Sequence, residues 1–164
     1  MAHVIFLRAA NVGGNNVFGP KQFCLDHPEL QLANIGHAGT FVCKFKGSQA
    51  DFADAVGAAL PIDVPMAIIP QEELQAFVAN PPAVQDGAKA EVTVLFDDPP
   101  AVVLPMEFPP GDWEARLLRV EGRLALTERK PGHKAKPPYK GLDKPLGVPG
   151  TTRSWNILVK AAQA

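Results

Sequence analysis

The fold is decided by the stretch His3-Val4-Ile5-Phe6-Leu7-Arg8-Ala9-Ala10-Asn11-Val12-Gly13-Gly14-Asn15-Asn16. Its opening apolar run predicts a buried strand. The polar, glycine-containing segment that follows predicts a loop, and Pro20 marks the first turn of a helix behind it. A strand, a Gly-Gly loop and a helix in this order bring backbone N–H groups close to a bound ligand, because glycine allows a close approach.

Strand and helix patterns continue to alternate as far as residue 69. We expect helices over residues 20–26 and 49–60, with Ser48 as the N-cap of the second. Expected strands cover residues 3–8, 31–35, 39–46 and 64–69. The resulting order β-α-β-β-α-β is that of the ferredoxin-like split unit. We therefore predict an α+β protein whose first half, residues 1–69, is ferredoxin-like.

The second half, residues 70–164, is expected to be a more irregular α+β structure. The chain contains 17 prolines, about twice the average usage, and many of them lie in this half. Patterns predict helices over residues 72–79, 141–146 and 151–162, and strands over 91–96, 114–120 and 123–127. Glu121-Gly122 predicts a tight hairpin turn. With 164 residues, we expect the two halves to form one compact unit.

The cysteines and histidines do not predict a metal site. Cys24 and Cys43 form no Cys-x-x-Cys pair, and the four histidines are scattered, so we expect no metal and no cofactor. Free thiols are typical of a reducing compartment. The opening apolar run is too short for a signal peptide, and no apolar stretch approaches membrane-spanning length. These features predict a cytoplasmic protein that does not interact with a membrane.

The opening loop is the first candidate binding site for an anion. Gly14 and Gly19 have Walker-like spacing, but Pro20 stands where the motif needs lysine, which argues against nucleoside triphosphate hydrolysis. The loop is otherwise rich in groups that bind anions, and it could equally be a structural strand-to-helix turn. Its candidate ligand-binding residues are Arg8, Asn11, Gly13, Gly14 and Asn15.

The second candidate lies near the end of the chain, in Gly150-Thr151-Thr152-Arg153-Ser154-Trp155-Asn156. Thr151 or Thr152 is expected to cap the last helix, with Arg153 in its first turn. A cation beside a helix N-terminus suits a phosphate or carboxylate, although it could also lie on a solvated face. We predict that a phosphate-bearing or other anionic small molecule binds between the Gly13-Gly14 loop and the Thr151–Arg153 helix start.

Charge is distributed unevenly between the two parts of the chain, which provides an alternative prediction. Residues 1–115 carry five basic and fourteen acidic side chains, whereas residues 116–164 carry eleven basic and three acidic ones. Nucleic acid could bind the basic region 116–160, although no known nucleic-acid motif is present. The two parts could equally neutralise each other within one fold. The candidate nucleic-acid residues are Arg129, Lys130, Lys134, Lys136, Tyr139 and Lys140.

A third possibility is a protein-interaction module that binds no small ligand. The sequence supplies no nucleophile or general base that would identify an enzyme, because it lacks the Gly-x-Ser-x-Gly elbow and its few serines have no nucleophile context. The sequence does not indicate an oligomeric state.

Two motifs resemble those of a bacterial family of unknown function, the domain of unknown function 1697 family. Phe6-Leu7-Arg8-Ala9-Ala10-Asn11-Val12-Gly13-Gly14-Asn15 resembles its Leu-Leu-Arg-Gly-Ile-Asn-Val-Gly-Gly opening. Leu146-Gly147-Val148-Pro149-Gly150-Thr151-Thr152-Arg153-Ser154-Trp155-Asn156 is similar to its closing Leu-Gly-Val-x-x-Thr-Thr-Arg-Asn-Trp signature. The two motifs occur in order near the two ends, so the resemblance covers nearly the whole chain.

The resemblance implies an α+β protein with ferredoxin-like halves and no established activity. The matched residues are Arg8, Asn11, Gly13 and Gly14 in the first motif, and Thr151, Thr152, Arg153 and Trp155 in the last. Two departures distinguish this chain from the family pattern. Ala9 stands where the family has glycine, and Ala38-Gly39-Thr40 stands where it has Ser-Gly-Asn.

Overall fold

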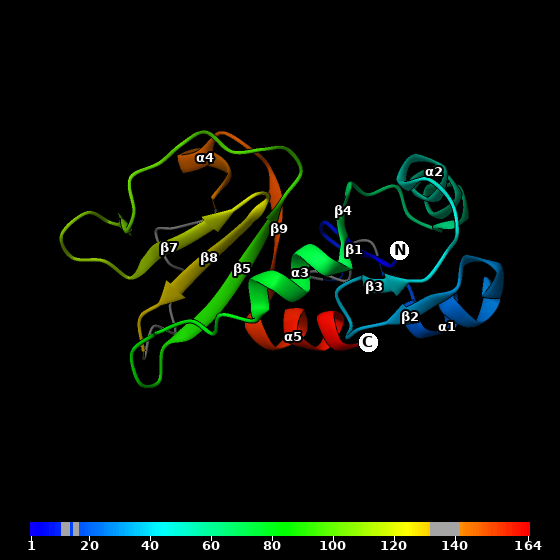
Figure 1. The fold of residues 1–164 in the computed structure, drawn as a ribbon, viewed down its shortest axis with the longest axis horizontal. Coiled ribbons are helices and arrows are strands. Elements are labelled where there is room, and N and C mark those ends of the chain that lie inside the picture. Colours follow the sequence, from blue (N-terminus) through cyan, green and yellow to red (C-terminus); the bar gives the residue numbers. More distant parts are fainter. Residues whose placement is uncertain (11–13, 15–16, 132–141) are drawn as a thin grey trace. The chain divides into compact units, whose positions relative to one another are not determined.

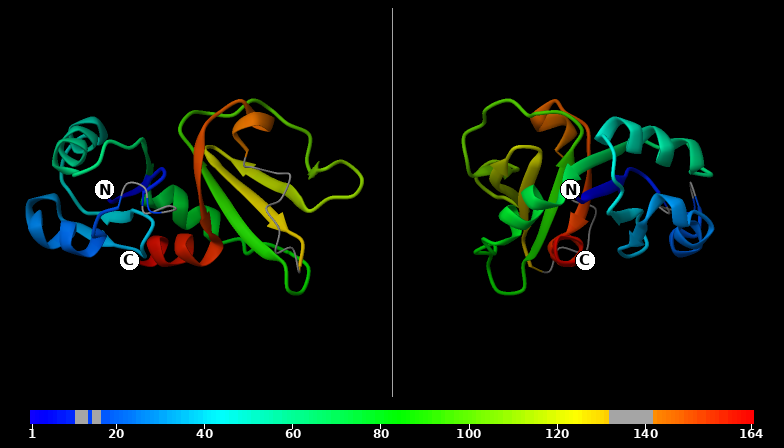
Figure 2. Two further views of the ribbon diagram at one scale, coloured as in Figure 1. Left: turned by 180° about the vertical axis from the view of Figure 1, so that it is seen from behind. Right: turned by 45° about the vertical axis from the view of Figure 1, so that its right-hand side comes forward.

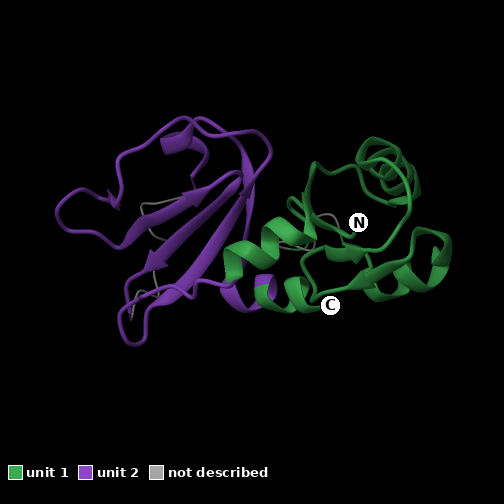
Figure 3. Ribbon diagram, viewed as in Figure 1, with its two compact units in different colours: residues 1–78, 159–164 green, residues 79–158 purple. Residues whose placement is uncertain are grey.

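A computed structural model describes residues 1–10, 14, 17–131 and 142–164. The chain forms two compact units, shown in different colours in Figure 3. The first unit comprises residues 1–78 and 159–164, and the second comprises residues 79–158. Both contain an antiparallel sheet and helices, which confirms the predicted α+β class.

The first unit has the element order that its sequence predicts. The four-stranded sheet has the strand order β2-β3-β1-β4, and every neighbouring pair is antiparallel. β3 therefore lies between β1 and β2, which are joined through α1, as in a split β-α-β unit. The elements are β1 (His3–Leu7), α1 (Pro20–Asp26), a 3-10 turn η1 (Pro28–Leu30), β2 (Leu32–Asn34), β3 (Thr40–Cys43), α2 (Gln49–Ala59), β4 (Met66–Pro70) and α3 (Gln71–Val78) (Figure 1).

The core of the first unit lies on one face of this sheet. Ile5, Leu7 and Phe41 on the strands pack with Phe23 of α1 and Phe52 of α2, so both helices cover the same face (Figure 2). The predicted N-cap of α2 is confirmed, because the backbone N–H of Asp51 donates to the Ser48 hydroxyl oxygen at 3.1 Å. Of the two free cysteines, Cys43 is buried and Cys24 is half-buried.

The second unit is built on a five-stranded sheet with the order β6-β7-β8-β5-β9. On one face, Leu95, Leu117 and Ala125 pack against Leu142 and Leu146 at α4. The elements are β5 (Lys89–Leu95), β6 (Met106–Phe108), β7 (Ala115–Glu121), β8 (Leu124–Arg129), α4 (Asp143–Leu146), β9 (Gly150–Ser154) and α5 (Trp155–Gln163).

The structure corrects two sequence expectations in the second half. The short strand β6 forms in the proline-rich segment where no strand is predicted, since residues 106–108 pair with β7. The chain over residues 150–154 is the strand β9, not the first turn of the last helix, which begins at Trp155. The predicted hairpin turn is confirmed, because Gly122 links β7 to β8 with a φ of +53°.

No helix among the described residues is long and apolar enough to cross a membrane.

Candidate functional site

Thr151, Thr152 and Arg153 lie on β9, so their predicted position at a helix start is wrong. They pair with Val94, Thr93 and Val92 of β5. The hydroxyl oxygens of Thr93 and Thr152 are 2.9 Å apart and share a hydrogen bond. Threonine favours helix N-caps, but it is also β-branched and favours strands. Here the pairing with β5 places these threonines in a strand.

Arg153 is buried within the second unit, with 8% of the residue's surface exposed. Its Nη1 donates to the Thr151 hydroxyl oxygen at 2.8 Å and to the Thr152 carbonyl oxygen at 3.0 Å. Burial lowers the pKa of Arg153 to about 10, because desolvation disfavours the charged guanidinium. These contacts give Arg153 a structural role in β9, in place of the predicted position in the first turn of a helix.

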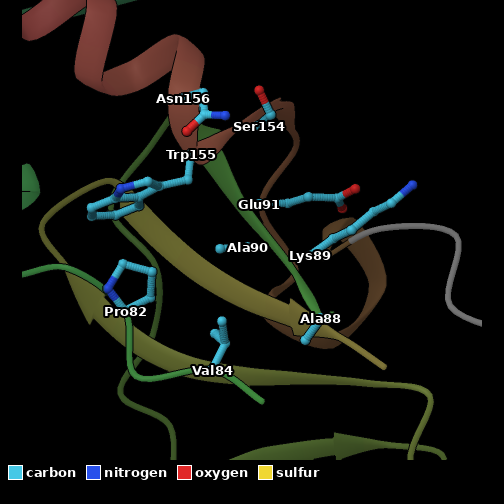
Figure 4. Close-up of a pocket in the computed structure, with 9 residues that line it drawn as sticks. All are labelled: Pro82, Val84, Ala88, Lys89, Ala90, Glu91, Ser154, Trp155 and Asn156. Atoms are coloured by element: carbon cyan, nitrogen blue, oxygen red, sulfur yellow. The ribbon is translucent and has the colours of Figure 1, made fainter. Parts of the chain in front are cut away.

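A pocket lies where β9 passes into α5, next to the start of β5. It has a volume of about 410 Å³ and is shown in Figure 4. Trp155, Pro82 and Val84 supply apolar surface, and Ser154 and Asn156 supply a hydroxyl and an amide. The remaining lining residues are Ala88, Lys89, Ala90 and Glu91. Apolar walls with a few polar groups are typical of small-molecule sites.

The charges that line this pocket are unequally compensated. Glu91 forms an ion pair with Arg129, whose Nη1 is 3.2 Å from the Glu91 Oε1. Within the described part of the chain, no ion pair involves Lys89, which is exposed. Lys89 is therefore the lining residue whose charge has no ion pair among the described residues, and its side chain extends away from Trp155 and Pro82 (Figure 4).

The N-terminus of α5 adds hydrogen-bond donors to the lining of the same pocket. α5 has nine residues, and Trp155 and Asn156 are its first two. The first N–H groups of a helix have no partner within the helix and carry a partial positive charge. Lys89 and the α5 start therefore contribute the same sign of potential to the pocket.

The opening loop lies in the first unit and is only partly described. Asn11, Gly13 and Asn15 are outside the described residues. Arg8 is half-buried, and its backbone N–H donates to the Pro65 carbonyl oxygen at 2.8 Å. Gly14 is exposed with a φ of +78°, a conformation that favours glycine.

Several basic residues of the region 116–160 form contacts within the second unit. Arg116 pairs with the fully buried Glu128, with 2.7 Å between the Arg116 Nε and the Glu128 Oε2. Arg119 pairs with Glu121 at 3.3 Å, and Arg129 pairs with Glu91. The Lys130 ammonium lies 5.3 Å from the centre of the Trp113 ring. The other candidate nucleic-acid residues, Lys134, Lys136, Tyr139 and Lys140, are outside the described residues.

The sequence expectations did not include the pocket itself. The sequence indicates Trp155 as a matched motif residue and as part of the apolar face of the last helix, and it does not indicate Lys89, Glu91 or Pro82 as site residues. Lys89 and Ser154 are far apart in sequence, and the pairing register of β5 and β9 brings them to one pocket. Among the described residues, no group of three or more His, Cys, Asp or Glu side chains could hold a metal ion.

Comparison with solved structures shows what the fold is similar to. A structure of the conserved bacterial protein SP0830 from Streptococcus pneumoniae matches with a TM-score of 0.66 and 16% sequence identity. The match covers 99% of this chain and 97% of that one. At this identity the likeness shows the fold alone. No family model and no curated protein matches the sequence.

Proposed function

We propose that this protein binds a small anionic ligand in the pocket between the start of β5 and the start of α5. The observation that carries the proposal is that Lys89, which forms no ion pair with the described residues, and the first residues of α5 line the same pocket of about 410 Å³, which has an indole wall. Carboxylate and phosphate groups accept hydrogen bonds from such donors, and the helix dipole adds to the attraction.

The apolar wall favours an organic anion over a bare inorganic one. The side chains that form this wall, Trp155, Pro82 and Val84, carry no charge. Each Å² of apolar ligand surface that is buried against them contributes roughly 25 cal/mol to the binding free energy. The hydroxyl of Ser154 and the amide of Asn156 can fix the orientation of the ligand.

The proposal extends to the Gly13-Gly14 loop of the first unit. Its sequence combines Arg8 with glycines and the amides of Asn11 and Asn15, a combination that favours an anion. We infer that this loop contributes to anion binding, and Asn15→Ala tests that contribution apart from the pocket.

The experiment is thermal unfolding of the protein with acetate, inorganic phosphate, nucleoside monophosphates and a short single-stranded oligonucleotide. A ligand at a hundred times its Kd stabilises by about 2.7 kcal/mol, which shifts the Tm of a chain of this size by several degrees. We expect a shift with a small anion that Lys89→Ala reduces. Lys144→Ala is the matched control, because Lys144 is an exposed lysine of α4 that does not line the pocket.

The other outcomes separate the alternatives. A shift with the oligonucleotide alone, falling steeply with salt, would favour nucleic-acid binding through the basic region. If a small anion raised the Tm of Lys89→Ala and of the wild type equally, binding in this pocket would be contradicted. No shift with any probe would leave the protein-interaction module as the better hypothesis.

A further inference from the structure

We propose that this protein forms a two-fold symmetric dimer in which β2 of one copy pairs antiparallel with β2 of a second copy. The two four-stranded sheets then continue into one another across the pair. β2 is an end strand of the sheet of the first unit (Figure 1). The inference is independent of the proposed function, because the proposed ligand pocket is lined by residues of the second unit.

The first argument is the direction of the backbone groups of β2. The Ile35 N–H donates to the Thr40 carbonyl oxygen at 2.8 Å, next to β3. Successive residues of a strand direct their N–H and C=O groups to opposite sides. Ala33 therefore shares the direction of Ile35, toward β3, whereas the N–H and C=O groups of Leu32 and Asn34 point out of the sheet.

These outward groups have no backbone partner. On this side of β2, no backbone hydrogen bond joins Leu32 or Asn34 to any residue that the structure describes. Ala33 between them is exposed, and no residue from 30 to 36 is charged or a proline. Charged residues and prolines are the usual means of keeping a further strand away from a sheet edge. This edge is therefore a template for pairing with another strand.

The other sheet edges in the described ranges are obstructed. The Gln49 side chain donates to the Ile68 carbonyl oxygen of β4 at 3.4 Å. The Arg153 side chain folds back on β9 and donates to the Thr152 carbonyl oxygen at 3.0 Å. β6 has a charged residue, Glu107, at its centre. Such features hinder the addition of a strand, so self-association by strand pairing is expected at β2.

A second copy of β2 matches this edge by symmetry. In antiparallel pairing about a two-fold axis at Ala33, Leu32 of each copy lies opposite Asn34 of the other. Leu32 and Asn34 then exchange both of their N–H···O=C bonds, which satisfies the outward groups of both strands. Ala33 meets Ala33 of the second copy with Cα atoms about 4.5 Å apart, a spacing that suits a small, uncharged side chain.

The ionisable groups at the two ends of β2 favour the same arrangement. Glu29 precedes the uncharged stretch and His37 follows it, and both residues are exposed. Antiparallel pairing brings the beginning of one β2 to the end of the other, so the Glu29 carboxylate of one copy approaches the His37 imidazole of the second. A parallel arrangement brings like groups together instead, which is destabilising.

Sedimentation of the full chain from micromolar to near-millimolar concentration tests the proposal. We expect the average mass to rise from 17.5 kDa toward twice that value. Ala33→Lys places two ammonium groups opposite each other at the axis, so it should weaken the dimer at least about fivefold. The matched control is Ala58→Lys, because Ala58 is an exposed alanine of α2, and it should dimerise like the wild type.

A charge exchange at Ala33 distinguishes a contact at the axis from damage to the fold. Ala33→Glu should weaken its own dimer as Ala33→Lys does. An equal mixture of the two variants should associate at least as tightly as the wild type, because opposite charges then meet at the axis. Two misfolded variants would not recover on mixing.

Hydrogen exchange identifies the strand that pairs. The amides of Leu32 and Asn34 should exchange more slowly as the protein concentration rises, because the dimer protects them by mass action. The Ile35 amide is already bonded to the Thr40 carbonyl oxygen, so its exchange should not change.

Two outcomes would overturn the proposal. One is a mass of 17.5 kDa at every concentration. The other is a dimer that Ala33→Lys leaves intact, with no slowing at Leu32 and Asn34, since another surface would then be responsible. Either outcome leaves the proposed function standing, because ligand binding is measured separately with Lys89→Ala.

Discussion

Ala9 adopts a backbone conformation that a glycine would adopt at lower cost. Its φ is +56°, in the left-handed region, and it is exposed directly after β1. A side chain in this region costs roughly 1–2 kcal/mol, which exceeds the entropy that a glycine loses on folding.

Ala9→Gly should therefore stabilise the protein by about 0.5–1 kcal/mol. Thermal or denaturant unfolding measures the change. The matched control is Ala33→Gly, because Ala33 is exposed on β2, where glycine should destabilise by a similar amount. A lower Tm for Ala9→Gly would mean that the alanine methyl group makes contacts that outweigh the backbone strain.

Gly39 shows how a motif glycine can be explained by packing alone. Its φ is +70°, and a Cβ at this position would lie 2.8 Å from the Leu7 Cδ1. The Leu7 N–H also donates to the Gly39 carbonyl oxygen at 2.8 Å. The glycine of the Ala38-Gly39-Thr40 segment therefore serves the junction between β1 and β3, and its presence is not evidence for a ligand.

At the scale of an element, β9 depends on the close approach of its first residue to β5. A Cβ at Gly150 would lie 2.7 Å from the Val94 carbonyl oxygen and 2.8 Å from the Thr93 Cγ2. A backbone oxygen cannot move away as a flexible side chain can, so the edge strand would have to shift. Gly150→Ala should destabilise by about 1–3 kcal/mol, the usual cost of overpacking.

The control for Gly150→Ala is Gly57→Ala in α2. The nearest atom to a Cβ at Gly57 is the Met66 Cε at 3.8 Å, an ordinary contact. Alanine is the better helix former, so this variant should gain up to about 1 kcal/mol. Hydrogen exchange of the β5 amides checks the mechanism, since Gly150→Ala should accelerate those that bond to β9. Unchanged exchange there would contradict the account of β9.

The same element shows which parts of the fold could be predicted from the sequence. Long apolar patterns such as residues 3–7 and the Ser48 cap of α2 depend on local chemistry, and both are confirmed. Thr151 and Thr152 satisfy a cap pattern and a strand pattern equally, and only their partner β5, some 60 residues away, decides between them. The pocket depends on the register of that pairing, which one sequence does not reveal.

At the scale of the whole molecule, part of the positive charge of residues 116–164 is neutralised by ion pairs within the second unit. Glu91, Glu121 and Glu128 each pair with an arginine of that unit. The fully buried Glu128 also accepts from the Gln85 N–H at 2.8 Å, so it joins the segment before β5 to the sheet. Three of the arginines in the basic region therefore have structural partners, which leaves fewer charges for a nucleic acid.

The division into units also assigns the two chain ends to the same unit, because residues 159–164 belong with residues 1–78. The buried Gln71 of α3 holds this returning segment: its Nε2 donates to the carbonyl oxygens of Ala161 at 2.9 Å and Ala164 at 3.2 Å. Gln75 donates to the Ala162 carbonyl oxygen at 3.0 Å. The end of α5 thus contributes to the stability of a unit that is otherwise formed by the first half of the chain.

A chain that ends at Leu158 should lose stability mainly in the first unit. It lacks the acceptors of Gln71 and Gln75 and the buried Ala161, and at about 1 kcal/mol for each hydrogen bond the loss is about 3 kcal/mol. Hydrogen exchange should then speed up more in β1 and β3 than in β5 and β8, because local opening follows local stability. Gln163→Ala, at an exposed position of α5, should leave both rates unchanged. Equal acceleration in both sheets would instead mean that the two units unfold as one.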